Sequence, residues 1–91
     1  MLIDVRQPGE WDIVRIPGAV LIPLDRLRDG RASAELAAVA GDRSIVLHCK
    51  SGGRSAEALK IARAAGFSAS VHLAGGVLAW IDQIDPDQPR Y

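Results

Sequence analysis

The chain has 91 residues, of which 48% are hydrophobic, a size and composition that suit one compact domain spanning residues 1–91. Eleven basic residues balance eleven acidic ones and 4% of residues are aromatic, which argues against binding to nucleic acid or to anionic lipid. The single cysteine excludes an internal disulfide, a zinc finger and a CxxC redox pair. With no signal peptide and no apolar run of about 18 residues, the sequence favours a soluble, cytoplasmic protein.

Four short apolar runs predict the strands of a sheet. They comprise Leu2, Ile3 and Val5, followed by residues 19–22, 44–48 and 70–73. Each run is partly β-branched and lacks clean alternation, which is typical of strands that are covered on both faces. The chain opens directly on the first run, so we expect these residues to form part of a larger protein.

Helical patterns separate the apolar runs and continue beyond the last one. We predict a helical turn from Pro23, helices over residues 33–40, 55–65 and 77–84, and an extended tail over residues 85–91. The stretch "PGEW", residues 8–11, is expected to be a loop. Strands that alternate with helices predict an α/β fold, with a parallel sheet and helices on both faces. Ligands of such folds bind beyond the carboxyl ends of the strands, where Cys49 lies.

The cysteine lies in a glycine-rich loop, "CKSGGRS", between a predicted strand and a predicted helix. Gly52 and Gly53 allow backbone angles that turn successive amides inward, into a nest that binds anions. The start of the helix adds its positive end, and Lys50 and Arg54 add full charges. We therefore expect the pKa of Cys49 to lie below about 8.5 and its sulfur to be a nucleophile. A buried, unreactive cysteine is the common alternative, but it would need none of these neighbours.

Two chemistries use a strand, a loop and a helix arranged in this way. Phosphate-ester hydrolysis uses a Cys-x5-Arg loop around a phosphate dianion, whereas sulfur transfer loads the thiolate with a sulfane sulfur to form a persulfide. A phosphatase loop would place its arginine at position 55, which is Ser55, whereas this sequence has Arg54. The loop is one residue short for phosphate, and a tighter cradle suits the smaller terminal sulfur of a persulfide.

The chain resembles a rhodanese-like sulfurtransferase domain from residue 2 to about residue 81. The segments "LIDVR", "IPGAVLIP", "VLHCKSGGRSAEAL" and "HLAGGVLAW" carry the resemblance. It implies a rhodanese-like, doubly wound parallel sheet in which Cys49 carries a persulfide, without a metal or an organic cofactor. The strand and helix that usually precede "LIDVR" in the family are absent from this sequence. The implied active-site loop and anion cradle consist of Lys50, Ser51, Gly52, Gly53, Arg54 and Ser55.

The last residues, "IDPDQPRY", are similar to the C-terminal end of proteins that fuse an adenylyltransferase to a rhodanese domain. This similarity implies a fused adenylyltransferase domain and, as acceptor, a small sulfur-carrier protein with a C-terminal Gly-Gly tail, in molybdopterin, thiamine or cysteine biosynthesis. The donor would be thiosulfate or a persulfide-donating protein. Family members often have histidine before "IPGA", and the fusion proteins commonly lack it, as does this chain with Arg15.

Two other functions remain open at this point. One is an inactive rhodanese-like module that only binds partners, although the intact Cys49 and its glycine loop argue against it. The other is a small cysteine-dependent phosphatase or arsenate reductase.

Two charged residues flank the end of the first strand, Asp4 and Arg6. Arg6 either reaches the anion site or pairs with Asp4 to fix the loop that follows. We favour the pair, since charges at a surface edge are more often structural than catalytic.

The histidines and the second glycine pair also have alternative interpretations. Adjacent strand residues point to opposite faces, so we expect the ring of His48 to face away from Cys49. We predict a structural role for His72, for which the sequence offers no partner. The pair Gly75-Gly76 either borders the active-site mouth or makes a turn into the last helix.

Overall fold

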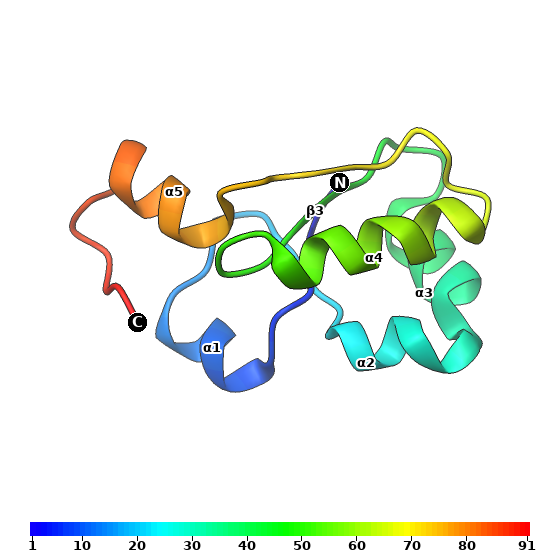
Figure 1. Ribbon diagram of the computed structural model, residues 1–91, viewed down its shortest axis with the longest axis horizontal. Helices are drawn as coiled ribbons and strands as arrows, with labels where there is room; N and C mark the ends of the chain where they lie inside the picture. Colours follow the sequence, from blue (N-terminus) through cyan, green and yellow to red (C-terminus); the bar gives the residue numbers. More distant parts are fainter.

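The structure, a computed structural model describing residues 1–91, is a four-stranded sheet with helices on both faces (Figure 1). The strands are β1 (Leu2–Asp4), β2 (Val20–Leu21), β3 (Val46–His48) and β4 (Val71–His72). The helices are α1 (Pro8–Ile13), α2 (Leu24–Arg26), α3 (Ala32–Ala40), α4 (Gly53–Ala64) and α5 (Gly76–Gln83). A kinked segment, η1 (Leu27–Arg31), joins α2 to α3.

All strands run parallel, in the order β2-β1-β3-β4. Ile3 pairs with Val20, and Val46 pairs with Leu2 on one side and with Val71 on the other. Parallel strands end at the same edge of a sheet, so the segments that follow β1, β3 and β4 meet there. The loop before α4 accordingly lies between α1 and α5 (Figure 1).

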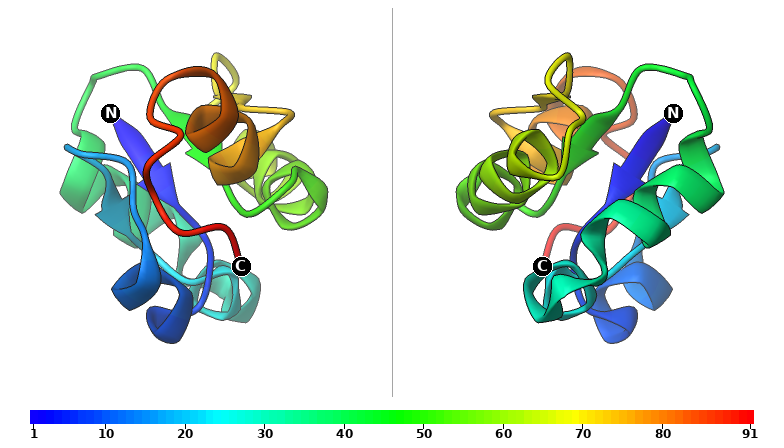
Figure 2. Two further views of the ribbon diagram at one scale, coloured as in Figure 1. Left: turned by 90° about the vertical axis from the view of Figure 1, so that its left-hand side faces the viewer. Right: turned by 90° about the vertical axis from the view of Figure 1, so that its right-hand side faces the viewer.

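Each face of the sheet carries its own hydrophobic cluster. The larger one joins Ile3, Val5 and Leu47 to residues of α3 and α4, such as Leu36 and Ala58. The smaller one consists of Val14, Ile16, Val77 and Ile81, with Leu2 packed against it. In the right-hand view of Figure 2, α3 and α4 stand in front of the sheet and α5 stands behind it. The alternation of Leu2 and Ile3 between the two clusters follows from the two-residue period of a strand.

The predicted α/β architecture is confirmed, and each predicted strand and helix is present with its ends within two residues of the prediction. Gly66 follows α4 with φ of +104°, and the amide of Phe67 donates to the carbonyl of Ala62 at 3.0 Å, so the helix ends as its sequence predicts. The longest helix, α4, has 12 residues, and none of the helices has the length and apolar character needed to cross a membrane.

The expected loop at residues 8–11 is wrong, because Pro8–Ile13 form α1. Pro8 occupies the first turn, where a missing N–H costs nothing. The amide of Gln7 donates to Oε1 of Glu10 at 3.1 Å, which satisfies a donor at the helix start. These local interactions stabilise a helix of 6 residues in which no residue is buried.

The expected extended tail is also wrong in part. The amide of Gln88 donates to the carbonyl of Asp85 at 3.2 Å, which makes a turn after α5. The chain then runs back towards α1 (Figure 1), and the hydroxyl of Tyr91 accepts a hydrogen bond from Nη1 of Arg6. Residues 85–91 therefore pack beside the carboxyl edge of the sheet rather than extending away from it.

Candidate functional site

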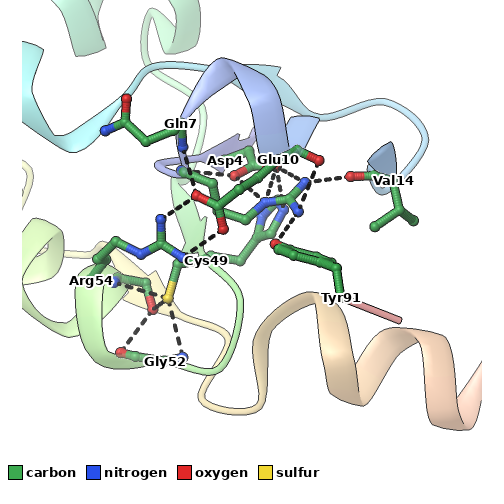
Figure 3. Close-up of polar contacts among 11 residues, drawn as sticks. Asp4, Gln7, Glu10, Val14, Cys49, Gly52, Arg54 and Tyr91 are labelled. Carbon is green, nitrogen blue, oxygen red and sulfur yellow. Dashed lines mark hydrogen bonds and ion pairs between the residues drawn. The ribbon is translucent and has the colours of Figure 1, made fainter. Parts of the chain in front are cut away.

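Cys49 directly follows β3 at the carboxyl edge of the sheet and is only 1% exposed. Its Sγ accepts hydrogen bonds from the amide of Gly52 at 3.1 Å and from the amide of Ser55 at 3.4 Å (Figure 3). The hydroxyl of Ser55 lies 3.6 Å from the same sulfur. Gly52 caps α4 and Ser55 lies in its first turn, so the sulfur occupies the N-terminal end of that helix.

The surroundings of Cys49 favour its thiolate. Burial raises the pKa of Cys49, but hydrogen bonds from the amide and hydroxyl of Ser55 and from the amides of Gly52 and Ser51 outweigh it, so the pKa lies below its ordinary value. The direction agrees with the prediction from the loop sequence. Hydrogen bonds from the loop amides and from Ser55 are the main source, and the charge of Arg54 adds a Coulombic attraction.

Two glycines let the backbone approach the loop closely. Gly52 has φ of +123°, and a Cβ there would lie 2.2 Å from the carbonyl oxygen of Ala74. Gly76 has φ of +59°, and a Cβ there would lie 2.4 Å from the carbonyl oxygen of Cys49. Only glycine fits at both positions, because a side chain would be strained and would also clash with backbone.

The start of α5 holds the loop in place from the other side. The amide of Val77 donates to the carbonyl of Cys49 at 2.8 Å, and the amide of Leu78 donates to the carbonyl of Lys50 at 3.1 Å. Gly75-Gly76 thus makes the turn into α5, one of the two interpretations of the sequence, and it also allows α5 to fix the backbone of Cys49.

The charged side chains of the loop have partners that the sequence does not reveal. Arg54 forms a bidentate ion pair with Glu10 of α1, with nitrogen–oxygen distances of 2.5 and 2.9 Å (Figure 3). This pairing with Arg54, together with weaker effects, lowers the pKa of Glu10 to about 2 despite partial burial. Nζ of Lys50 lies 4.7 Å from the centre of the Tyr91 ring, a cation–π contact.

Asp4 and Arg6 form the ion pair that the sequence analysis favours, but the pair is buried. Nη2 of Arg6 lies 2.7 Å from Oδ2 of Asp4, and both side chains are 0% exposed. Arg6 also donates to the carbonyl of Val14 at 2.6 Å and to the hydroxyl of Tyr91, which ties the end of α1 and the chain end to β1. The expected surface location is wrong, because a bidentate pair with further hydrogen bonds can be buried.

The pair also sets the charge state of Asp4. Burial raises the pKa of Asp4, whereas contacts with His48 and with Arg6 lower it. The lowering effects outweigh burial, and the pKa of Asp4 is about 2. Nε2 of His48 lies 3.4 Å from Oδ2 of Asp4 and makes no hydrogen bond, so we attribute the low value mainly to the guanidinium of Arg6.

The two histidines lie on opposite faces of the sheet. His48 is buried beside Asp4 on the face of the smaller cluster, as its alternation with Cys49 predicts. His72 is half-buried at the end of β4, and its Nδ1 lies 2.9 Å from Oγ of Ser55. The sequence offers no partner for His72, and the structure supplies one, Ser55, which also contacts the sulfur of Cys49.

Some of these contacts had a signal in the sequence and others had none. The stretch "QPGE" has proline at a first helical position and glutamate three residues after Gln7, a helix-start pattern that would have placed Glu10 near the carboxyl edge. His72 ends the strand after the Cys49 strand, and parallel neighbours end at one edge. No pattern in the sequence indicates the return of Tyr91.

The arrangement stabilises a negative charge at the sulfur of Cys49. Amide donors and the end of α4 favour a negative charge at Sγ and on any atom bonded to it. No group of three or more His, Cys, Asp or Glu residues is arranged to hold a metal ion.

Comparison with known proteins places this chain in a family. The model of the rhodanese-like domain matches residues 1–83. The chain is 53% identical over 90 residues to the probable adenylyltransferase/sulfurtransferase MoeZ of Mycobacterium tuberculosis, covering 99% of this chain and 22% of MoeZ. It is 34% identical over 94 residues to the adenylyltransferase and sulfurtransferase MOCS3 of Drosophila ananassae, covering 100% of this chain and 21% of that protein.

A solved structure agrees with these relatives. The human single-domain sulfurtransferase TSTD1 superimposes with a TM-score of 0.73 and 27% identity, covering 90% of this chain and 80% of that one. This chain spans about a fifth of the length of MoeZ and of MOCS3. It belongs to the rhodanese-like domain family and is similar to the rhodanese region of adenylyltransferase/sulfurtransferase proteins.

Proposed function

We propose that this domain is a sulfurtransferase that carries sulfane sulfur as a persulfide on Cys49. The main support for the proposal is the position of Sγ of Cys49. This sulfur lies 3.1 Å from the amide of Gly52 and 3.4 Å from the amide of Ser55, at the start of α4. Donors at this point stabilise the thiolate and also the anionic terminal sulfur of a persulfide. The names of MoeZ and TSTD1 support the same class of reaction.

In the first half of the cycle, a donor loads the enzyme. The thiolate of Cys49 attacks the outer sulfur of thiosulfate, the S–S bond of thiosulfate breaks, and sulfite leaves with the bonding electron pair. The product is a Cys49 persulfide whose terminal sulfur carries one negative charge. A persulfide-donating protein would load Cys49 in the same way, with its own thiolate as the leaving group.

In the second half, the sulfur passes to an acceptor. An acceptor thiolate attacks the terminal sulfur, and Cys49 is the leaving group. The loop amides stabilise the Cys49 thiolate that is released, as they did before loading. With a sulfur-carrier protein, the terminal sulfur attacks the adenylated C-terminal glycine and displaces AMP. Two thiol equivalents then reduce the resulting acyl disulfide. The first attacks Sγ of Cys49 and releases the thiocarboxylate, and the second attacks the mixed disulfide so formed, takes the first thiol away as a disulfide and restores the Cys49 thiolate.

The proposed partners follow from the relatives and from the exposed part of the loop. Ser51 and Gly53 are exposed and small, so a narrow Gly-Gly tail can approach the loop at these positions. MoeZ and MOCS3 are named as adenylyltransferases as well as sulfurtransferases, which supports a fused or partner adenylyltransferase that activates the carrier. A reducing compartment such as the cytoplasm suits this thiolate chemistry.

Incubation with thiosulfate followed by intact-mass measurement tests the proposal. We expect the folded protein to gain one sulfur atom, and the gain to disappear after treatment with cyanide, which accepts sulfane sulfur. Cys49→Ser is the matched control and should gain no sulfur while retaining its fold by circular dichroism. A folded wild-type protein without the adduct, with either thiosulfate or a persulfide donor, would contradict the proposal.

The two alternatives give different results in the same set of measurements. An inactive binding module would show an ordinary thiol pKa near 8.5 when alkylation of Cys49 is followed against pH. A phosphatase would hydrolyse an aryl phosphate in a reaction that depends on Cys49. We expect neither result, because the amides lower the thiol pKa and the loop has Ser55 where the phosphatase arginine would stand.

A further inference from the structure

The hydroxyl of Ser55 lies between the sulfur of Cys49 and the imidazole of His72. Oγ is 3.6 Å from Sγ and 2.9 Å from Nδ1 of His72. It is also 3.2 Å from the carbonyl oxygen of Gly52, a possible third partner. Ser55 is 0% exposed and Cys49 is 1% exposed, whereas His72 is half-buried at the end of β4. The three side chains thus connect a buried sulfur to the surface.

A serine hydroxyl has one proton to donate and can accept from two donors, which limits the arrangements of protons in this chain. While Cys49 is a thiol, its S–H donates to Oγ of Ser55. The hydroxyl then donates to unprotonated Nδ1 of His72, or to the carbonyl of Gly52. That carbonyl also accepts the amide of Ala56 at 3.0 Å, so it keeps a partner in either case.

The arrangement changes when Cys49 becomes a thiolate. Sulfur can then only accept, so the hydroxyl of Ser55 turns its single proton to Sγ. The 2.9 Å contact with His72 remains a hydrogen bond only if Nδ1 is protonated and donates to Oγ. The anionic form of Cys49 is therefore coupled to a protonated Nδ1 through one shared hydroxyl.

We propose that His72 is a positioning residue of the nucleophile, which takes the thiol proton of Cys49 through Ser55 and so favours the thiolate. The S–H bond of Cys49 breaks as an O–H bond forms on Ser55, and the original O–H bond of Ser55 breaks as an N–H bond forms at Nδ1. The thiolate keeps the electron pair, and the imidazole becomes an imidazolium. The half-buried ring then releases a proton from Nε2 to water.

The other charged groups near the sulfur already have partners. Arg54 is paired with Glu10, and Lys50 lies over the ring of Tyr91. His48, the neighbour in sequence, faces Asp4 on the other side of the sheet. Arg63 of α4 donates to the carbonyl of Ser70, at the opposite end of β4. The first turn of α5 carries no acidic residue. Apart from Cys49 itself, His72 is the titratable side chain that contacts the hydroxyl of Ser55.

This inference rests on the proposed function only in using Cys49 as the nucleophile, and its test needs no sulfur donor. The rate at which iodoacetamide alkylates Cys49 is measured against pH in the wild type, in His72→Asn and in His72→Gln. Asparagine places an amide near the site of Nδ1 and can hydrogen-bond to Ser55, but it cannot take a proton. We expect both variants to react roughly tenfold more slowly below the wild-type midpoint, with the midpoint raised by about one pH unit.

Val71→Ala is the matched control on the same strand, because Val71 is 50% exposed and outside this chain of contacts. It should reproduce the wild-type profile. If His72→Asn does so as well while folded by circular dichroism, a hydrogen bond alone suffices and the proton relay is refuted.

A second measurement reads His72 directly. The chain has two histidines, so His72→Asn assigns the ring signal of His72 in the NMR spectrum by removing it. We expect the ring signal of His72 to shift as Cys49 ionises in the wild type, and Cys49→Ser to lack this shift, because it has no thiolate to couple to the ring. A shift that persists unchanged in Cys49→Ser would overturn the coupling. Since neither measurement uses thiosulfate, failure of the relay and failure of sulfur transfer are distinguishable.

Discussion

Replacing Gly76 by alanine should disturb the nucleophile from the far side of its loop. Gly76 begins α5 with φ of +59°, and the new methyl group would lie 2.4 Å from the carbonyl oxygen of Cys49 and 2.5 Å from that of Lys50. Neither oxygen can swing away freely, because the amides of Val77 and Leu78 hold both of them. The loop must therefore move, and the amides around Sγ move with it.

The size of the effect follows from two contributions. A positive φ costs a residue with a side chain about 1–2 kcal/mol. Forcing a methyl group into a filled site typically costs about 1–3 kcal/mol more. We expect Gly76→Ala to lower the free energy of unfolding by about 2–5 kcal/mol, a large part of the roughly 5–15 kcal/mol that holds a domain folded.

Urea unfolding followed by tryptophan fluorescence measures the stability, and alkylation of Cys49 against pH measures the state of the loop. Gly66→Ala is the control, since Gly66 has φ of +104° and nothing lies within 4 Å of a Cβ built there. It should show the cost of the positive φ alone and an unchanged alkylation profile. If Gly76→Ala loses no more stability than Gly66→Ala, the close approach of α5 to the loop does not constrain Cys49 and the reasoning fails.

Three further changes test other contacts. Arg6→Ala leaves the carboxylate of Asp4 buried and unpaired, so the urea midpoint should fall by the equivalent of about 3–5 kcal/mol, and an unchanged midpoint would contradict a structural role for the pair. Asp4 and Glu10 have folded pKa values of about 2, below their ordinary values of 3.8 and 4.5. The folded state thus binds fewer protons than the unfolded chain, so their stabilisation is complete above about pH 5 and is lost as the pH falls towards 2. Thermal unfolding at several pH values should show this loss, of about 2 kcal/mol for Asp4 alone, and a flat profile between pH 5 and 2 would refute it. Tyr91→Ala removes the cation–π contact beside the loop, worth about 0.5–1 kcal/mol, and should speed alkylation of Cys49 by roughly two- to fivefold, whereas a slower reaction would show that the chain end does not cover the loop.

The sequence predicts those features of the fold that depend on residues close together in the chain. Short β-branched runs and helical stripes locate the strands and most helices, and Gly66 marks the end of α4. The loop around Cys49 is predictable for the same reason, because its amides and the start of α4 come from seven consecutive residues, 49–55.

The unpredicted part of the site consists of contacts between distant segments. The partner of Arg54 is Glu10 and the partner of Ser55 is His72, and both pairs depend on where α1 and β4 lie relative to α4. Periodicity does not predict helix α1, because no residue in it is buried and it therefore lacks an apolar stripe. Its proline and its capping glutamate were the remaining signals.

The parallel sheet has a consequence for when the thiol becomes reactive. Every ladder joins residues far apart in the chain, such as Ile3 with Val20 and Leu2 with Val46, and no hairpin can form first. Such non-local pairing forms slowly, because the chain must lose the entropy of closing a long loop before the stabilising contacts between strands can form. The backbone of Cys49 is held by α5, which comes after the loop in the chain and so leaves a ribosome later than the loop does. On the proposed role of Cys49, we therefore expect a nascent or partly folded chain to carry an ordinary thiol, and enhanced nucleophilicity to arise only when folding is complete.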